Sequence, residues 1–199
     1  MKKHSILVAA CIALLSSSCV YAEDFEINSW TADHIKVGAT KNADGSAMLL
    51  STESPHSGKQ CLKLVYNLQN GNVEYVVNPT FGPPLLPDPN GGLLKLSFWV
   101  KGDPSSKLLP MVVRLVDAQG QMFQYSLRDS EKALLNKDWT LYTTNLDLNK
   151  SDVHFGGPKD GVLHFPLKLI SFSMQTLESD SGTIYMDDLS WEALPPEGK

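Results

Sequence analysis

Apolar and polar residues alternate along several short segments of this chain, which predicts β-strands with one buried face. The clearest case is 93–101, where every second residue from Leu94 to Val100 is apolar. Further strands are predicted over these ranges: 47–51, 60–67, 73–77, 111–117, 121–127, 139–146, 168–176 and 182–191. Ala118-Gln119-Gly120 predicts a hairpin turn, and the last two ranges are expected to pair as a second hairpin.

Long loops are predicted between these strands, and long helices are not. Residues 78–92 hold five prolines and three glycines, a density that excludes a regular element. A second loop is expected at 147–166, a turn of helix at 129–136, and a short first strand at 24–27. About nine or ten short strands without a long amphipathic helix predict an all-β fold, an antiparallel β-sandwich or jelly roll.

The N-terminal residues have the pattern of a secretory signal peptide. Lys2 and Lys3 precede an apolar run at 6–15 that is too short to span a bilayer, and Val20-Tyr21-Ala22 supplies small residues for cleavage. We therefore expect a signal peptide at 1–22, one domain at 23–199, and a periplasmic or extracellular location. No other apolar run is long enough to span a membrane.

A lipoprotein anchored through Cys19 is the alternative to simple export. The preceding residues, Leu15-Ser16-Ser17-Ser18, fit a lipid-modification site poorly. Under either reading Cys61 is the one cysteine outside the leader that can lie in the folded domain, so an internal disulfide is excluded.

Charge narrows the class of partner. Loss of Lys2 and Lys3 leaves 15 basic and 22 acidic residues, so the formal charge falls from −5 to −7. An acidic chain without a cluster of Lys and Arg is not expected to bind nucleic acid.

The segment 182–191 places a carboxylate among apolar residues. Strict alternation puts Tyr185, Asp187, Leu189 and Trp191 on one face, and Asp188 on the other. An ionised carboxylate there is costly unless it binds a cation or accepts hydrogen bonds. Asp187 is therefore expected either to bind a cation or to bond a neighbouring loop, and the two aspartates are not expected to act as a catalytic pair.

Three motifs, in order along the chain, resemble those of galactose-binding-like β-sandwiches of the carbohydrate-binding-module type. They are Ser57-Gly58-Lys59-Gln60-Cys61-Leu62, Leu96-Ser97-Phe98-Trp99-Val100-Lys101-Gly102-Asp103 and Gly182-Thr183-Ile184-Tyr185-Met186-Asp187-Asp188-Leu189. The Trp139 segment also fits a strand of that family. The resemblance covers essentially the whole chain after the leader.

The resemblance implies a structural Ca²⁺ ion that ties both chain ends to one loop. By position, Glu26, Glu53 and Asp187 would be its side-chain ligands, and carbonyl groups near Ser57 and Lys59 would complete the shell. Carboxylate and carbonyl oxygens are the ligands that Ca²⁺ prefers.

Trp99 is the leading candidate for contact with a polysaccharide or oligosaccharide. Flat aromatic rings stack on the apolar faces of sugars and Trp adds a polar group, while Lys95 and Lys101 on the same face can bond hydroxyl or acid groups. Phe81 in the first long loop is a further candidate. The alternative is that Trp99 packs beneath a long loop.

No pattern of catalytic residues is found. The paired carboxylates of glycosidases and the Gly-x-Ser-x-Gly nucleophile motif are both missing, and His154 and His164 do not have zinc-ligand spacing. The sequence thus favours a secreted, non-catalytic carbohydrate-binding sandwich. A protein-interaction domain of the cell envelope is the runner-up, and a polysaccharide-active enzyme is third.

Overall fold

The computed structural model describes residues 22–24, 27, 30–77 and 92–194. Its elements have these bounds: β1 (Ala22–Asp24), η2 (Ala32–His34, a 3-10 helix), β2 (Ile35–Lys41), β3 (Ala47–Ser51), β4 (Cys61–Gln69), β5 (Asn72–Val77), β6 (Leu93–Lys101), β7 (Val112–Val116), β8 (Gln121–Ser126), α1 (Ser130–Leu134), β9 (Thr140–Asp147), β10 (Val153–Gly156), β11 (Lys168–Gln175) and β12 (Ser179–Ala193).

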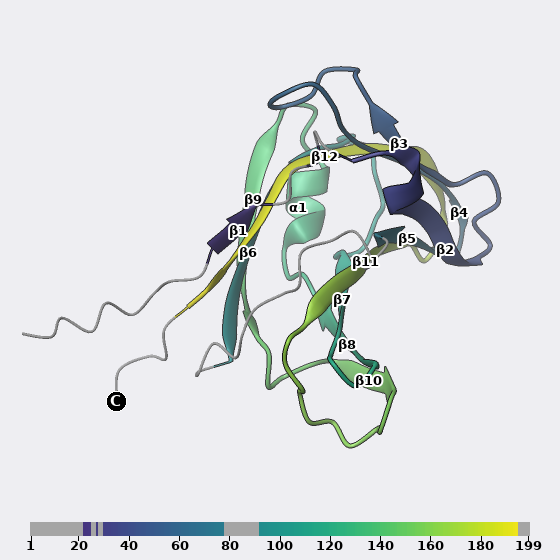
Figure 1. Ribbon diagram of the computed structural model, residues 1–199. Helices are drawn as coiled ribbons and strands as arrows, with labels where there is room; N and C mark the ends of the chain where they lie inside the picture. Colours follow the sequence, from purple (N-terminus) through teal and green to yellow (C-terminus); the bar gives the residue numbers. More distant parts are fainter. Residues whose placement is uncertain (1–21, 25–26, 28–29, 78–91, 195–199) are drawn as a thin grey trace, which may run out of the picture.

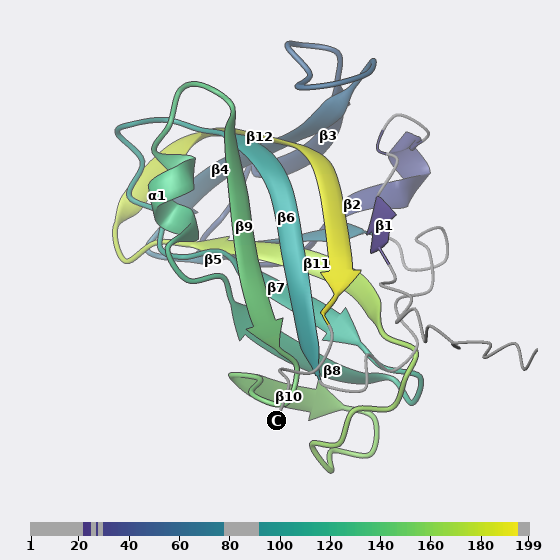
Figure 2. The same ribbon diagram turned by 90° about the vertical axis from the view of Figure 1, so that its left-hand side faces the viewer.

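The strands form two antiparallel sheets packed face to face, which confirms the predicted β-sandwich. The first sheet has the order β3-β4-β12-β6-β9, with β1 paired to β12, and the second has the order β10-β8-β7-β11-β5-β2. Figure 2 looks onto the first sheet, where β9, β6 and β12 lie side by side in front of the second. The described residues contain no helix long and apolar enough to cross a membrane.

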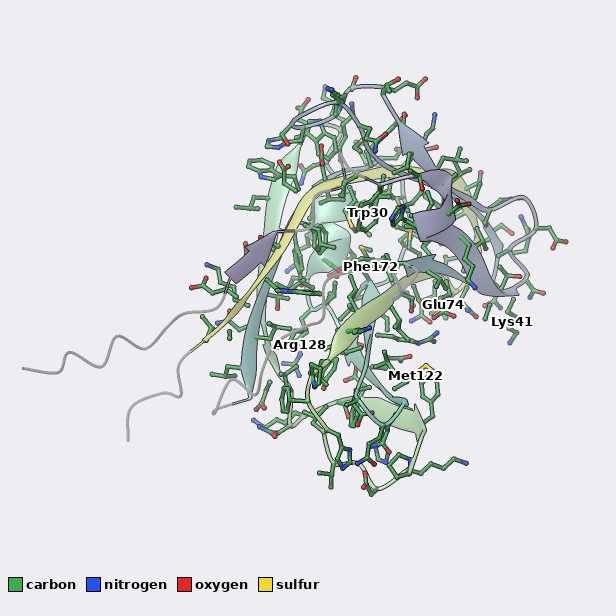
Figure 3. The ribbon with its side chains drawn as sticks, in the orientation of Figure 1. Trp30, Lys41, Glu74, Met122, Arg128 and Phe172 are labelled. Carbon is green, nitrogen blue, oxygen red and sulfur yellow. The ribbon has the colours of Figure 1, made fainter. Side chains whose placement is uncertain are left out.

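The core fills the space between the sheets with alternate side chains from both. Leu94, Leu96, Phe98 and Val100 of β6 are at most 1% exposed, as the alternation predicts. Phe172 of β11 comes from the opposite sheet and packs against Phe98, with ring centroids 6.0 Å apart. Figure 3 shows Phe172 in the layer between the sheets.

Pairing of the strands confirms one predicted hairpin and corrects the other. β7 and β8 pair around the turn at 118–120. β11 and β12, expected to pair, belong to different sheets, because the chain crosses the sandwich between them. Alternation shows which face of a strand is buried, but it carries no information about which strand is the neighbour.

Two strands lie where the sequence predicts no regular structure. β2 falls in a segment without strict alternation, and its pairing with β5 is interrupted between Val37 and Thr40. β10 lies in the predicted loop 147–166 and is a short edge strand beside β8. The predicted first strand at 24–27 overlaps β1 only at Asp24, and Ile27 does not belong to a strand. Glu26 lies outside the described residues.

Strict alternation fails in β12 at a β-bulge. The pairing of β12 with β6 shifts between Asp187 and Ser190, and Asp188 has a φ of 46°. Met186 and Leu189 are both fully buried although three positions separate them. The bulge moves the inward side chains from even to odd positions, so the prediction that Tyr185 shares a face with Leu189 and Trp191 is wrong.

Candidate functional site

The bulge places Asp187 on the outer side of the first sheet, beneath the loop that leads into β4. Its side chain is nonetheless buried, at 1% exposed. One carboxylate oxygen accepts the backbone N–H groups of His56 (2.8 Å) and Ser57 (3.1 Å), and the other accepts the N–H of Asp188 (2.9 Å). Burial raises the pKa of Asp187 above its ordinary value, and these N–H bonds oppose that rise only in part.

Asp188 bonds the same loop through side chains. His56 Nδ1 lies 2.6 Å from one of its carboxylate oxygens, and the Ser57 hydroxyl donates to the other. The prediction that the two aspartates face opposite sides of the sheet is therefore wrong, because the bulge turns both toward the loop. Both carboxylates fasten residues 56–57 to the final strand.

The same loop covers one face of Trp99. The rings of His56 and Trp99 stack with centroids 3.9 Å apart, and the Trp139 ring meets His56 edge-on at 5.7 Å. Trp139 Nε1 donates to the carbonyl oxygen of Ser54 at 3.2 Å. Trp99 is half-buried and packs against the short loop between β3 and β4, not against the long loop that the alternative invoked.

The two predicted lysines lie on this outer face with Trp99, as the alternation of β6 requires. Lys95 forms an ion pair with Glu192 at 3.2 Å, and the Lys101 ammonium lies 5.3 Å from the centre of the Tyr185 ring. Phe81 lies outside the described residues. The structure places Trp99, Lys95 and Lys101 but does not test whether they bind a sugar.

Of the three carboxylates expected to bind Ca²⁺, Glu53 and Asp187 belong to the described residues and Glu26 does not. Glu53 is exposed, and its carboxylate accepts hydrogen bonds from Lys63 (2.7 Å) and Tyr185 (3.1 Å). The Lys63 bond is the main reason why the pKa of Glu53 is lowered. The hydrogen bonds that Asp187 accepts come from the backbone N–H groups of His56, Ser57 and Asp188. Among the described residues, no three His, Cys, Asp or Glu side chains are placed to hold a metal ion.

A second polar cluster, which the sequence does not reveal, lies on the outer face of the second sheet. Arg114 of β7 forms an ion pair with Glu74 of β5 at 2.6 Å, and its Nε donates to Gln124 of β8 at 3.0 Å. The Ser171 hydroxyl of β11, which lies between those strands, donates to Glu74 at 2.5 Å. We call Glu74, Arg114, Gln124 and Ser171 the Arg114 cluster.

The Arg114 cluster is ordered but reaches solvent. The Arg114 side chain is 21% exposed and that of Glu74 is 12% exposed. Burial alone would raise the pKa of Glu74, but hydrogen bonds from Ser171 and Arg114 outweigh it and hold the pKa below its ordinary value of 4.5. A rigid guanidinium and carboxylate of this kind can bond neighbouring hydroxyl or acid groups bidentately.

Apolar side chains surround the Arg114 cluster on the same face. The guanidinium lies 5.7 Å from the centre of the Phe155 ring of β10. Met122 pairs in register with Phe155, and Val76 pairs with Ser171. Figure 1 shows the second sheet bending from β2 to β10 with its outer face on the inside of the bend, and Figure 3 places Glu74 and Met122 on that side.

Register alone brings the Arg114 cluster together. Its four residues come from four strands that span about a hundred positions of the chain, and Ser171 aligns with both Val76 and Arg114. The signal in the sequence that could have revealed the cluster was a charged residue at an outward position of an otherwise apolar strand. Two strands have one: Glu74 in β5 and Arg114 in β7. Without the strand order, nothing connects those two positions.

Two other polar groups have local structural partners. The Asp117 carboxylate is fully buried and accepts N–H groups of Gln119 and Gln121, while His164 Nδ1 lies 3.0 Å from it.

A pocket of about 290 Å³ lies where the ends of β8 and β9 meet, and Arg128 and Asp152 are among its lining residues. Asp152 accepts the backbone N–H of Ser126.

Comparison with known proteins identifies the fold and no family. No protein-family model and no curated protein sequence matches the chain. Among solved structures, the family 11 carbohydrate-binding module from Clostridium thermocellum, in complex with a β-1,3-1,4-mixed-linked tetrasaccharide, aligns with a TM-score of 0.57 and 14% identity. That alignment covers 90% of this chain and all of the module.

Two further structures extend the comparison. A promiscuous carbohydrate-binding module of the β-sandwich superfamily aligns at a TM-score of 0.52 and 16% identity, over 81% of this chain and 58% of that one. An exo-β-agarase aligns with a TM-score of 0.50 and 16% identity, over 86% of this chain and 25% of the enzyme. The chain therefore has the β-sandwich fold of carbohydrate-binding modules, as the motifs predicted.

Proposed function

We propose that this protein is an exported, non-catalytic carbohydrate-binding β-sandwich, and that the glycan lies across the outer face of the second sheet. The Arg114 cluster is the observation that supports this choice of face. It presents donors and an acceptor in fixed positions, with apolar side chains beside them, which is the combination that sugar-binding surfaces need. The curved face and the fold shared with carbohydrate-binding modules support the same reading.

The outer face of the first sheet is the alternative binding surface. It holds the predicted residues Trp99, Lys95 and Lys101, and Leu141 beside Trp99 is 51% exposed. The loop that carries His56 covers one face of the Trp99 ring, so that ring offers less stacking surface than an uncovered one. We therefore rank the second sheet first.

Affinity electrophoresis on a panel of soluble polysaccharides tests the proposal. Phe155→Ala removes an apolar partner without leaving a buried charge unpaired, so the variant should fold and bind at least one glycan more weakly. Trp99→Ala is the matched control on the opposite face and should bind normally. Thermal melting of both variants separates a loss of binding from a loss of folding.

Each outcome decides between named alternatives. Normal binding by Phe155→Ala together with weakened binding by Trp99→Ala would move the site to the first sheet. A lack of retardation on every polysaccharide would overturn carbohydrate binding and favour a protein-interaction domain. Release of reducing sugar from the same panel would identify an enzyme. The predicted Ca²⁺ ion and the export signal remain predictions, because Glu26 and residues 1–21 lie outside the described residues.

A further inference from the structure

The charged residues of the sandwich are divided unequally between its two sheets. The six strands of the second sheet carry Lys36, Lys41, Lys168 and Arg114, and their one acidic residue is Glu74. The strands of the first sheet carry three lysines and seven acidic residues. The second sheet is therefore cationic within a chain whose formal charge is −5.

The register puts these cations on the outer face, around the Arg114 cluster. Lys36 pairs with Val76, Lys41 with Asn72, and Lys168 with Val116. The three partner residues are half-buried and point outward, so the lysines do too. Lys36 and Lys41 are exposed, and neither forms an ion pair with a described carboxylate. Figure 3 shows Lys41 and Glu74 on the same side of the sheet.

Glu74 and Arg114 balance each other's charge, so the surplus positive charge of these strands comes from Lys36, Lys41 and Lys168. In the adjoining loops, Asp160 accepts a bond from Gln121, and Glu178 forms an ion pair with Lys107 at 3.1 Å. The Arg114 guanidinium bonds Glu74 through one terminal nitrogen and Gln124 through Nε. Its other N–H groups are available to a ligand.

The spacing of the cations suits a polymer. Neighbouring strands lie about 4.8 Å apart, so Lys36 on β2 and Arg114 on β7 are separated by three strand spacings, roughly 14 Å. A single small anion cannot reach all of these side chains, but a chain that carries an anionic group at intervals can.

We propose, on the basis of the function above, that the natural ligand is an anionic polysaccharide bearing carboxylate or sulfate groups. Lys36 and Lys41 attract the anionic groups, and Arg114 donates its remaining N–H groups to them, while Phe155 and Met122 contact the apolar faces of the sugar rings. The charge of the face, rather than its shape, then selects acidic glycans over neutral ones.

The test compares four probes in affinity electrophoresis: polygalacturonate, dextran sulfate, a neutral β-1,3-1,4-glucan and single-stranded DNA. We expect retardation by at least one of the two acidic glycans. It should weaken as salt is raised from 50 to 300 mM, because the Debye length falls from roughly 14 Å to about 6 Å over that range. Lys36→Gln/Lys41→Gln should weaken that binding by about fivefold to tenfold. Lys95→Gln/Lys101→Gln removes two charges from the first sheet and should leave it unchanged.

The outcomes separate this inference from the proposed function. Tighter binding of the neutral glucan, or equal losses in both double variants, would overturn the acidic ligand and leave carbohydrate binding intact. Equal retardation by DNA would also overturn it, because the face would then bind polyanions of any class. Binding to none of the four probes, together with no retardation on the polysaccharide panel described above, would reject carbohydrate binding itself.

Discussion

Replacement of Asp187 by alanine is expected to destabilise the sandwich, because this carboxylate joins the final strand to the loop before β4. The substitution removes the acceptor of three backbone N–H groups, from His56, Ser57 and Asp188. Bonds of this kind contribute about 1 kcal/mol each after exchange with water, and more where the acceptor is charged. Water can reach the half-buried loop in the variant, so we expect a total loss of about 3 kcal/mol.

Thermal unfolding measures this loss directly. For a domain of this size about 1 kcal/mol shifts the melting temperature by roughly 2–4 °C, so Asp187→Ala should lower it by about 6–12 °C. Asp187→Asn keeps one acceptor oxygen, so its melting temperature should lie between those of Asp187→Ala and the parent protein. Asp138→Ala, at an exposed position, is the matched control and should change the free energy of unfolding by less than about 0.5 kcal/mol.

The reasoning fails if Asp187→Ala melts within about 2 °C of the parent protein, a shift of at most about 1 kcal/mol. It also fails if Asp138→Ala is destabilised equally, since the effect would then not depend on the N–H bonds. A third contradiction would be a loss in Asp187→Ala that leaves the loop unaffected. Faster hydrogen exchange at the amides of His56 and Ser57 is therefore the second measurement.

Three further predictions concern calcium, the buried thiol and pH. Removal of the predicted Ca²⁺ ion with EDTA should lower the melting temperature of the parent protein but not that of Asp187→Ala, and an unchanged melting temperature of the parent would contradict the ion. Cys61 is 0% exposed and burial raises its pKa to about 11, so after removal of 1–22 a thiol reagent at pH 8 should react only on unfolding; rapid labelling of the native protein would contradict this. The pKa of Glu74 is lower in the folded protein than in the unfolded chain, so the unfolded chain binds the Glu74 proton more tightly. The contribution of ionised Glu74 to the free energy of unfolding is therefore complete above pH 4.5, and it is lost as pH falls through the pKa of the folded state. The stability gap between the parent and Glu74→Gln should narrow below pH 4.5, and a gap that widens there would refute the sign.

The β-bulge shows where a local pattern stops being informative. Alternation correctly placed Leu94 to Val100 in the core and Trp99, Lys95 and Lys101 outside it, because β6 is regular along its length. In β12 one additional residue reversed the phase after Asp187, and the two aspartates came to face one loop. The sequence contains Asp187-Asp188 but nothing that states the φ of 46° at Asp188.

The amino-acid sequence by itself determined the all-β architecture, most of the strands and the buried face of the regular ones, because these follow from the local period of apolar residues. The strand order was decided only by the tertiary structure, because it depends on pairings between segments far apart in the chain. That order put β11 and β12 in different sheets and gathered Glu74, Arg114, Gln124 and Ser171 on one face. It also separated a cationic sheet from an acidic one, a division that the net charge of the chain conceals.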